Sequence, residues 1–476
     1  MELETERLFI KLLTLSQLKL WINDISMLEI ELNCKCDKGP IDGFFLNIIN
    51  NQIKIIENDP ENYVYHSFWF IIRKADKRAV GTIDYKNIPN ERKEVEIGYG
   101  LEKQFEHNGY MTEAVGAFCK MAFMDKKIET IIAETEAENM ASSKVLERCG
   151  FIKYKEERTH WWRLNKNMNK YINVNRIEFV ITNECSGKCK HCSAKLLSKK
   201  ESINAEIAIK VINDLCKNYS INSIMTFGGE PLLYAGTICQ IHKTAYENNI
   251  KNREIITNGY FSKNIDKIKD TAKKLYETNI TKILLSIDAF HQESIPLEPV
   301  IQFGKALLEY GFNELKTHPA WVVNKEHDNI YNRRTRELLN TFFEIGIEPS
   351  DGNNIIPEGN AVKYLREYFK KPTIEEIFLP CGSMPYTGTL NKINTININP
   401  NGDIEKCSFL LGNVYEKNIL EIIKNYDPFK NMYSKILIEG GVKKLYDFIL
   451  NQGIEIDIEE CYSPCMLCKE IIQNNI

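Results

Sequence analysis

The chain has 476 residues, of which 43% are hydrophobic and 26% charged, and this length predicts two to four domains. Its formal net charge of −4 argues against a general nucleic-acid or membrane-binding surface, and no apolar run reaches the roughly 18 residues that span a bilayer. Because the start of the chain lacks the basic and apolar segments of a signal peptide, we expect a cytoplasmic protein without nucleic-acid or membrane partners.

The first 165 residues combine strand-like and helix-like patterns. Strands are predicted at 68–72, 80–85, 95–101 and 130–134, and helices at 112–124 and 141–148. The next segment, 166–176, is rich in Asn and Lys and has no apolar period, so we interpret it as a linker. The pattern before the linker predicts a domain of mixed α and β structure over residues 1–165.

Two segments of this domain resemble a known family. Residues 95–115, VEIGYGLEKQFEHNGYMTEAV, predict a strand, a glycine-containing loop and a helix start, and such a turn presents backbone N–H groups to a phosphate. Residues 138–151, ENMASSKVLERCGF, contain the pattern Asn-x-x-Ser-x-x-Val-Leu-Glu-x-x-Gly-Phe. Both segments resemble the GNAT acetyltransferases, nearest the ribosomal-protein-alanine type. The resemblance implies a GNAT α+β fold and acetyl-CoA as cofactor.

This resemblance also implies which residues contact acetyl-CoA and which one acts as a base. The implied contacts lie in the loop and at the start of the second segment: His107, Asn108, Gly109, Tyr110 and Asn139. Glu106 departs from the family pattern, which has a neutral or basic residue facing the pyrophosphate there. Glu96, on the strand before the loop, is a candidate catalytic general base or, alternatively, a solvated strand residue. The domain is thus either a working acyltransferase or a retired fold that recognises a substrate or partner.

After the linker, strand-like runs alternate with amphipathic helical stretches. Strands are predicted at 176–181, 223–227, 254–257, 282–287 and 320–323. This alternation predicts a parallel sheet with helical crossovers. In barrels of this kind, functional residues lie at the C-terminal ends of the strands. We therefore expect the important side chains directly after each strand.

Three cysteines follow the first of these strands with the spacing C-x-x-x-C-x-x-C. They are Cys185, Cys189 and Cys192, and His191 lies inside the same loop. Three thiolates on one loop can hold three irons of a 4Fe–4S cluster, which leaves the fourth iron open for chemistry. The alternative is a zinc site that shares a distant fourth ligand.

Further polar segments follow the next strands. Gly228, Gly229, Glu230 and Pro231 come directly after the second strand, where glycines permit close backbone approach and a carboxylate can accept from an ammonium. With the cysteine triplet, this GGEP segment resembles the radical SAM superfamily. The resemblance implies a partial (β/α)6 barrel, S-adenosylmethionine as cofactor and contact between GGEP and its methionyl amino group. It also implies cofactor-binding roles for Asn258, Ser286 and Asp288, whose alternative role is turn and capping chemistry.

The radical SAM resemblance implies a type of reaction. An electron donor such as flavodoxin or ferredoxin reduces the cluster, S-adenosylmethionine is cleaved, and the 5′-deoxyadenosyl radical abstracts a hydrogen from the substrate. An iron–sulfur redox or sensor protein that never cleaves S-adenosylmethionine is a rival class, against which the GGEP segment argues.

The end of the chain contains a second group of cysteines. Its members are Cys381, Cys407, Cys461, Cys465 and Cys468. The group resembles the SPASM/twitch extension of radical SAM peptide maturases and implies a small Cys-rich domain. One 4Fe–4S cluster takes four thiolates, so we expect one auxiliary cluster and one spare cysteine, with Cys461 the weakest ligand. Structural zinc is the alternative, and Asn401-Gly402 predicts a hairpin turn in this segment.

These interpretations together predict an α/β multidomain enzyme. Its parts are a GNAT-like domain over 1–165, a linker over 166–176, a radical SAM core over 177–375 and an auxiliary-cluster domain over 376–476. The expected role is tailoring of a peptide or small metabolite by radical hydrogen abstraction combined with N-acetylation. The alternative keeps the radical enzyme and gives the GNAT-like domain a recognition role only.

Overall fold

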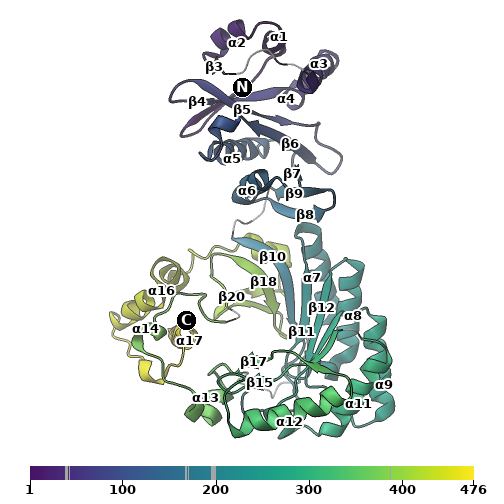
Figure 1. The fold of residues 1–476 in the computed structure, drawn as a ribbon. Helices are drawn as coiled ribbons and strands as arrows, with labels where there is room; N and C mark the ends of the chain where they lie inside the picture. The colour runs from purple at the N-terminus through teal and green to yellow at the C-terminus, as the bar shows by residue number, and fades with distance from the viewer. Residues whose placement is uncertain are drawn as a thin grey trace. The chain divides into compact units, whose positions relative to one another are not determined.

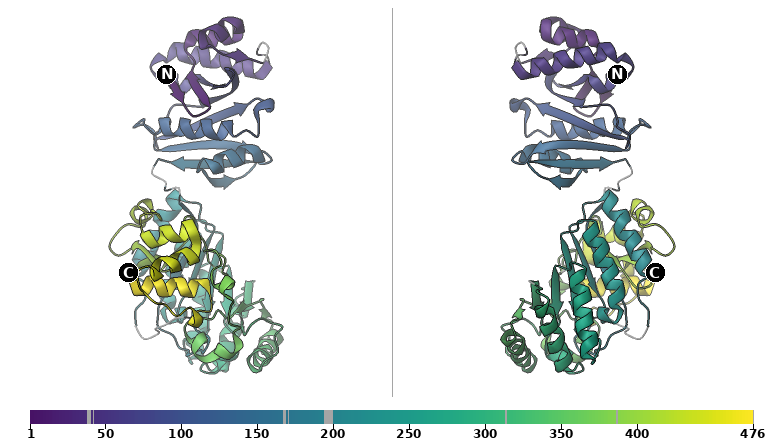
Figure 2. Two further views of the ribbon diagram at one scale, coloured as in Figure 1. Left: turned by 90° about the vertical axis from the view of Figure 1, so that its left-hand side faces the viewer. Right: turned by 90° about the vertical axis from the view of Figure 1, so that its right-hand side faces the viewer.

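The computed structural model describes residues 1–37, 41, 43–166, 169, 171–193, 200–312, 314–385 and 387–475. The chain divides into two compact units, unit 1 over Met1–Lys170 and unit 2 over Tyr171–Ile476, so the protein is α/β and multidomain. Figures 1 and 2 show the helices and strands of each unit. In the described ranges, no helix is both long and apolar enough to cross a bilayer.

Unit 1 is built on a sheet with the strand order β1-β2-β4-β5-β6-β7-β9-β8, and β3 pairs with β5. The strands are β1 (Glu2–Glu4), β2 (Leu8–Leu12), β3 (Lys35–Cys36), β4 (Phe68–Arg73), β5 (Arg78–Tyr85), β6 (Glu94–Leu101), β7 (Thr130–Glu136), β8 (Ile152–Glu156) and β9 (Thr159–Asn165). Strands β6 and β7 run parallel and pair only where residues 94–96 lie beside 130–132. Residues 97–101 of β6 pair with β5 and not with β7, so β6 has an unpaired edge there.

Helices cover both faces of this sheet (Figure 1). The helices are α1 (Leu15–Asn23), α2 (Ile25–Leu32), α3 (Gly43–Asn58), α4 (Tyr63–His66), α5 (Tyr110–Ala122) and α6 (Met140–Arg148). Helices α1 to α3 share one hydrophobic core, and α5 and α6 share another. Because both faces of β4 are buried, its sequence is a continuous apolar run. The strands and helices predicted for this region are confirmed to within a few residues, and α1 to α3 are additional to them.

Unit 2 contains a sheet with the strand order β16-β14-β13-β12-β11-β10-β18-β19-β20. Its strands are β10 (Ile172–Val180), β11 (Ser223–Phe227), β12 (Asn252–Thr257), β13 (Lys282–Leu285), β14 (Glu314–Thr317), β16 (Glu348–Pro349), β18 (Ile393–Ile398), β19 (Asp403–Lys406) and β20 (Phe409–Asn413). A separate pair joins β15 (Ala320–Trp321) to β17 (Asn353–Asn354). Strands β10 to β14 and β16 pair in parallel, which matches the expected (β/α)6 arrangement.

Helices connect the parallel strands of unit 2, and α7, α8, α9 and α11 lie along one face of the sheet (Figure 1). The connecting helices are α7 (Ala205–Asn218), α8 (Ala235–Glu247), α9 (Ile265–Glu277), α10 (Ala289–Gln292), α11 (Leu297–Glu309) and α12 (Ile330–Glu344). The later helices are α13 (Asn360–Leu365), α14 (Ile374–Ile377), α15 (Ile419–Lys424), α16 (Met432–Leu450) and α17 (Pro464–Asn475). Helices α14, α16 and α17 pack around a smaller core of their own.

Two strands of unit 2 differ from the prediction. β10 begins at Ile172, so residues 172–176 of the predicted linker belong to a strand. Ile172 and Val174 are buried while Asn173 and Asn175 are exposed, an alternation that the polar composition hides. The fifth parallel strand is β14, and not residues 320–323. The sequence pattern did not reveal β14 because Leu315 is the one strongly apolar side chain in Glu-Leu-Lys-Thr.

The C-terminal segment is continuous with the sheet and does not form a separate compact unit. Strand β18 pairs in parallel with β10, and β19 and β20 extend the sheet antiparallel. The predicted hairpin turn at Asn401-Gly402 is confirmed, and Gly402 has a φ of 87°, which favours glycine. The sheet thus joins the C-terminal cysteine segment to the same body as the parallel strands.

Candidate functional sites

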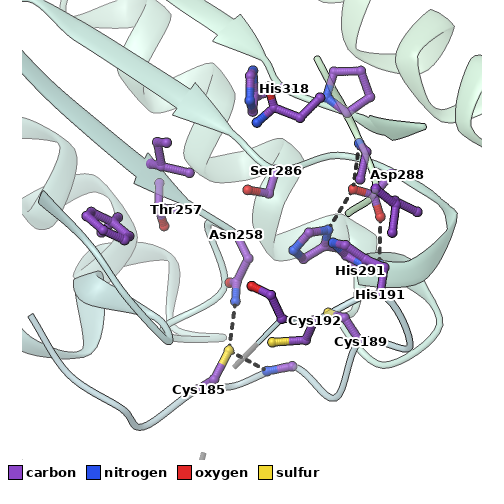
Figure 3. A pocket seen from close by; sticks show the side chains of 18 of the residues that line it. Cys185, Cys189, His191, Cys192, Thr257, Asn258, Ser286, Asp288, His291 and His318 are labelled. Atoms are coloured by element: carbon purple, nitrogen blue, oxygen red, sulfur yellow. Dashed lines mark hydrogen bonds and ion pairs between the residues drawn. The ribbon is translucent and has the colours of Figure 1, made fainter. Parts of the chain in front are cut away.

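A cavity of about 340 Å³ lies at the C-terminal ends of the parallel strands of unit 2 (Figure 3). The ends of parallel strands meet at one edge of the sheet, so side chains that follow different strands converge there. The sequence-predicted residues that line it are Cys185, Cys189, Cys192, Gly228, Gly229, Asn258, Ser286 and Asp288. Thr257, His318, Pro319 and Ala320 also line the cavity, although no sequence pattern singled them out as site residues. His318, Pro319 and Ala320 follow β14, a strand that the sequence pattern did not predict.

The three cysteines of the loop after β10 surround part of this cavity. Burial raises the pKa of the Cys185 thiol to about 11, and the nearby charges of Glu230 and Cys189 add to that effect. The Cys185 Sγ accepts hydrogen bonds from the Gly187 backbone N–H at 3.4 Å and from the Asn258 amide at 3.6 Å (Figure 3). Removing thiol protons is therefore costly here unless a metal centre replaces them.

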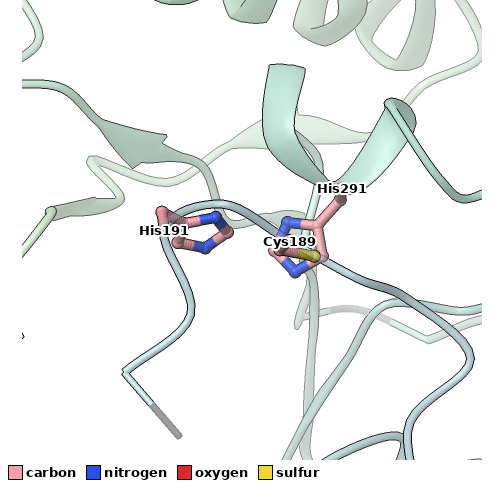
Figure 4. A group of neighbouring side chains, drawn as sticks. All are labelled: Cys189, His191 and His291. Atoms are coloured by element: carbon pink, nitrogen blue, oxygen red, sulfur yellow. The ribbon is translucent and has the colours of Figure 1, made fainter. Parts of the chain in front are cut away.

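A different set of atoms converges on a single point. Among the described residues, the ligand atoms of Cys189, His191 and His291 all lie within 4.8 Å of one another (Figure 4). His191 Nδ1 is buried and has no hydrogen-bond partner in the described part of the chain. Burial lowers the pKa of His191 to about 4, so this ring is neutral at physiological pH. This arrangement of one cysteine and two histidines is compatible with the zinc alternative.

The second histidine of this group is held in place by Asp288. His291 Nδ1 and Asp288 Oδ2 are 2.8 Å apart, and the His291 ring also hydrogen-bonds to the Cys189 thiol. Burial alone would lower the pKa of His291, but Asp288 and Cys189 raise it well above its ordinary value. The imidazole therefore carries a proton that it donates to the sulfur of Cys189.

The hydrogen bonds of Asp288 are those of the capping alternative to the predicted ribose contact. Its carboxylate is fully buried and accepts from the backbone N–H groups of Phe290, His291 and Ala320 as well as from the His291 ring. Burial would raise the pKa of Asp288, but the two histidines His291 and His191 lower it well below its ordinary value. A carboxylate offers about four acceptor positions, and these four hydrogen bonds occupy them. Asp288 caps α10 and orients His291.

The GGEP segment packs closely against the chain's own backbone. A Cβ at Gly228 would lie 2.6 Å from the Thr182 backbone oxygen, and one at Gly229 would lie 2.1 Å from that of Glu184. The Gly229 N–H donates to Thr182 and the Glu230 N–H to Glu184, both at 2.8 Å. The glycines therefore let this segment pair closely with the backbone that leads into the cysteine loop, while their own backbone still lines the cavity.

Glu230 is fully buried behind the cavity wall. It accepts from the Leu232 N–H at 2.9 Å, from the Thr257 hydroxyl at 2.6 Å and from the Asn258 N–H at 2.9 Å. Burial raises its pKa to about 7. Neither Glu230 nor Pro231 lines the cavity, so Gly228 and Gly229 are the part of the GGEP segment that faces it. Glu230 instead ties the end of β11 to the end of β12.

Asn258 and Ser286 are better placed for a cofactor. The Asn258 amide spans the Cys185 sulfur, the Ser186 hydroxyl at 3.2 Å and the Tyr260 N–H at 2.8 Å. Ser286 lines the cavity and its hydroxyl is available to a ligand (Figure 3). Both residues come directly after strands of the sheet, β12 and β13, and both line the cavity.

The C-terminal cysteines separate into four and one. The charges of Cys407 and Cys381 reach Cys465, and those of Cys381, Cys407 and Cys465 reach Cys468, so these four thiols are neighbours. Burial and these charges raise the pKa of Cys465 to about 11. Cys461 lies apart in the core of α14, α16 and α17, where its thiol contacts the Asp457 carbonyl and the Glu470 carboxylate at 3.8 Å. Burial and the nearby carboxylates of Glu470, Asp457 and Glu460 raise the pKa of the Cys461 thiol.

The loop before α5 has the geometry of an anion site in unit 1. Gly109 is the N-cap of α5 with a φ of 77°, and it offers no side chain to accept from the first turn. The N–H groups of that turn therefore remain available to an anion. The Arg7 guanidinium donates to the Asn108 carbonyl at 2.9 Å and lies over the Tyr110 ring. His107 is also in the left-handed region, with a φ of 62°.

Two further predicted residues of unit 1 lie elsewhere on the same fold. Asn139 is the N-cap of α6 and accepts from the Ser142 N–H at 2.9 Å, which gives it a capping role. Glu96 is the last residue of β6 that pairs with β7, directly before the unpaired edge. Burial and the charge of Glu134 raise the pKa of Glu96, an effect that favours proton acceptance near neutral pH.

Comparisons with known families agree with this division. Residues 46–152 match the family described as Acetyltransferase (GNAT) domain, and residues 179–356 match the Radical SAM superfamily. The chain therefore contains a GNAT acetyltransferase domain followed by a radical SAM domain. These domains imply acetyl-CoA in the first and a 4Fe–4S cluster with S-adenosylmethionine in the second.

Individual relatives match one part of the chain each. The uncharacterized N-acetyltransferase YjdG of Bacillus subtilis is 32% identical over 100 residues, which are 21% of this chain and 60% of that protein. A Saccharolobus islandicus protein named "Probable GTP 3',8-cyclase" is 23% identical over 285 residues, 52% of this chain and 86% of that protein. The ribosomal-protein-S5-alanine acetyltransferase structure from Vibrio fischeri is 20% identical, with a TM-score of 0.28, over 35% of this chain and 97% of that chain.

The cysteine cavity fits the cluster that a radical SAM domain implies. Ligands of a single ion converge on one point, whereas thiolates that hold a cluster stand around it. Cys185, Cys189 and Cys192 line one cavity but do not form a convergent group among the described residues. The Asn258 and His291 donors next to two of these sulfurs also suit a cluster, because hydrogen bonds to sulfur stabilise its reduced form.

Proposed function

We propose that the chain is a bifunctional tailoring enzyme that combines radical hydrogen abstraction with acetyl-CoA-dependent N-acetylation of a peptide or small metabolite. The observation that carries the proposal is the cavity in which three cysteine thiols meet the side chains of Asn258 and Ser286 at the ends of parallel strands. We further propose a cytoplasmic location and an electron donor such as flavodoxin or ferredoxin.

In unit 2, each residue has a defined task. Cys185, Cys189 and Cys192 hold the cluster, while Asn258 and the protonated His291 donate hydrogen bonds to two of their sulfurs. When bound, the cluster and S-adenosylmethionine supply the 5′-deoxyadenosyl radical that abstracts hydrogen from a substrate. The Ser286 hydroxyl is free to bind a ribose hydroxyl, and the backbone of the GGEP glycines forms the adjoining wall.

The four neighbouring C-terminal thiols support one auxiliary 4Fe–4S cluster. Four thiolates satisfy one such cluster completely, so Cys381, Cys407, Cys465 and Cys468 form a sufficient set. Iron analysis separates this from structural zinc: the cluster predicts iron and sulfide that persist when the first triplet is removed. Cys465→Ala should remove that iron and Cys461→Ala should retain it, whereas zinc in the purified protein would contradict the auxiliary cluster.

In unit 1, backbone groups and one carboxylate perform acetyl transfer. The first-turn N–H groups of α5 bind the pyrophosphate of acetyl-CoA, and the unpaired edge of β6 offers backbone groups to its amide-containing arm. Glu96, at the point where β6 and β7 separate, accepts the proton that the amine loses. A domain that only recognises a substrate or partner would not need all three of these features.

We do not propose GTP as a substrate of this chain, although the cyclase relatives are named for it. Among the described residues that line the cysteine cavity, none is lysine or arginine. A nucleoside triphosphate needs several cationic or N–H donors for its phosphates. A peptide or uncharged metabolite suits this lining better.

The radical assignment is tested by 5′-deoxyadenosine formation in the anaerobically reconstituted full chain, with S-adenosylmethionine and a strong reductant. The test variant changes Cys185, Cys189 and Cys192 to Ala, and the control changes Cys149, Cys216 and Cys239, which lie outside both cysteine sets. We expect product from the native chain and the control but not from the test variant. No product from a native chain with an intact, reduced cluster would overturn the assignment.

The acetyltransferase assignment is tested separately by calorimetric titration of the full chain with acetyl-CoA. We expect saturable binding by the native chain. Gly109→Glu, which adds a carboxylate at the N-terminus of α5, should weaken it strongly. No binding by the native chain would favour the alternative, a radical SAM enzyme whose first domain only recognises a substrate or partner.

A further inference from the structure

Unit 1 contains a second cavity, of about 640 Å³, on the face of the sheet that α1 to α3 cover. One part of its lining is aromatic and another is charged. The residues that define these two parts are Trp21, Phe45, Phe68 and Phe70 for the aromatic part, and Asp84, Lys86 and Glu102 for the charged part. Neither the sequence patterns nor the family matches assign a role to this cavity.

The aromatic part is a wall of four rings around Trp21. The Trp21 ring contacts Phe70 at 4.6 Å, and Phe45 and Phe68 each at 5.6 Å, all edge to face. Trp21, Phe68 and Phe70 are at most 9% exposed, whereas Phe45 is 37% exposed. Such a wall favours a flat apolar group, and the exposed Phe45 ring offers it a route of entry.

The charged part is a buried carboxylate with a replaceable partner. Asp84 is 6% exposed, and its ion-pair partner among the described residues is the Lys86 ammonium at 3.3 Å. The Lys86 side chain is 47% exposed and lies over Gly98, where a Cβ would be 2.3 Å from Lys86 Cε. Burying a carboxylate is costly unless a cation meets it, and a flexible lysine supplies that cation without fixing it.

The position of the cavity connects it to acetyl transfer. Tyr99, Gly100 and Leu101 line it, and they belong to the stretch of β6 whose other edge is not paired with β7. An amine in the cavity would therefore lie beside the strand that is proposed to hold acetyl-CoA. This link rests on the acetyltransferase part of the proposed function.

We infer that this cavity binds the acetyl acceptor, and that the acceptor is a primary amine bearing an aromatic group. The acceptor's ammonium replaces the Lys86 ammonium at Asp84, and its ring packs against Trp21, Phe45 and Phe70. Lys86 thus occupies the ammonium position in the absence of substrate. Burial raises the pKa of Asp84 to about 6, partly offset by Lys86, so the carboxylate is ionised at neutral pH and attracts a cation.

The reaction that follows balances without another reagent. The bound ammonium loses a proton to become a free amine, which attacks the thioester carbonyl of acetyl-CoA. An amide C–N bond forms, the C–S bond breaks, and the second amine proton goes to the leaving sulfur. The products are the N-acetylated amine, free CoA thiol and one proton released to solvent.

The experiment uses the full chain and three probes: phenylalaninamide, alaninamide and N-acetylphenylalaninamide. The first has both ammonium and ring, the second lacks the ring, and the third lacks the ammonium. Binding is followed by tryptophan fluorescence without acetyl-CoA, with Trp21→Phe to assign the signal, and turnover by release of CoA thiol. We expect phenylalaninamide to bind at least about tenfold more tightly than either analogue.

Variants separate the inference from the proposed function. We expect Asp84→Asn to raise the KM for phenylalaninamide about tenfold or more, Lys86→Met to lower it, and Glu157→Gln, an exposed carboxylate outside the cavity, to leave it unchanged. Equal binding of all three probes, or an unchanged KM in both Asp84→Asn and Lys86→Met, would overturn the inference even if acetyl-CoA binds. Probe binding that depends on Asp84, in a chain that binds no acetyl-CoA, would support the cavity and overturn acetyl transfer.

Discussion

Each unit has a glycine-containing loop after a strand and a buried carboxylate, yet the two units use them differently. In unit 2, Gly229 pairs with the chain's own backbone, and Glu230 is satisfied by three protein donors. In unit 1, a Cβ at Gly109 would meet only the Arg7 guanidinium at 3.4 Å, and Asp84 has a flexible lysine as its ion partner. A group with fixed internal partners is structural, whereas a group with open or replaceable partners is available to a ligand.

The largest expected effect comes from adding a methyl group to a glycine of each loop. Gly229→Ala places a Cβ 2.1 Å from the Glu184 carbonyl oxygen, which is backbone and cannot rotate away. We expect this variant to displace the cysteine loop and to lose most of the iron bound by Cys185, Cys189 and Cys192. Gly109→Ala, the matched control, should cost only about 1–2 kcal/mol for its left-handed backbone and keep the iron. Iron content per chain, measured after anaerobic reconstitution, decides between them. Native iron content in Gly229→Ala would show that the close pairing of this loop with the Glu184 backbone is not needed to hold the cysteine loop.

The next effect concerns the carboxylate of GGEP. Glu230→Ala leaves the Thr257 hydroxyl and the Leu232 and Asn258 N–H groups without their acceptor. At about 1–3 kcal/mol for each unsatisfied buried group, we expect a loss of several kcal/mol in the free energy of unfolding of unit 2. Glu230→Gln keeps part of the network and should lose less.

A calorimetric titration with S-adenosylmethionine tests the competing interpretation of this residue. If Glu230 contacts the methionyl amino group, Glu230→Gln should weaken S-adenosylmethionine binding without lowering the unfolding temperature. That result would reverse the structural role assigned to Glu230.

The sequence predicted where the site lies better than what each side chain does. The cysteine triplet, Asn258 and Ser286 follow apolar strands, and the convergence of parallel strand ends places them in one cavity. The partners of a carboxylate come from other strands: Glu230 depends on Thr257 and Asn258, and no local pattern reveals that pairing. Short strands of mixed polarity such as β14 carry little periodic signal, so the residues that follow them were missed.

The cavity of unit 1 was beyond sequence reasoning for a related reason. Its walls come from α1, α3, β4, β5 and β6, which are separated by many residues in the chain. The sequence around Trp21 and Asp84 does not show that folding places both residues in the lining of one cavity. The same packing explains why four C-terminal thiols lie near one another while the Cys461 thiol, in the same predicted set, contacts Asp457 and Glu470 instead.

A smaller effect tests whether Asp84 is maintained for binding at the expense of stability. Because burial raises its folded-state pKa from 3.8 to about 6, the folded state holds this proton more tightly than the unfolded state. Its contribution is therefore favourable at low pH, declines as pH rises from about 4 to 6, and is flat above that range. Asp84→Asn removes the cost, so this variant should be more stable than the native chain at pH 8, by up to about 3 kcal/mol.

Urea unfolding of unit 1 at pH 4 and pH 8 measures this difference. The stability gain of Asp84→Asn should be present at pH 8 and nearly absent at pH 4. An equal gain at both pH values would mean that ionisation of Asp84 costs the fold nothing, and would remove the contrast with Glu230.

The smallest expected effect links the internal network of unit 2 to its cluster. Asn258→Leu removes the amide donor to the Cys185 sulfur while keeping a side chain of similar size. Without that donor the reduced cluster is less stabilised, so its reduction potential should fall. A weak hydrogen bond of about 1 kcal/mol corresponds to roughly 40 mV for one electron, which sets the scale of the shift. Redox titration monitored by electron paramagnetic resonance measures it.

Ser186→Ala, which removes another partner of Asn258 but leaves the sulfur contact, is the control and should shift the potential less. Equal shifts in both variants would mean that Asn258 acts by holding the loop, and the fixed network of unit 2 would then be structural throughout.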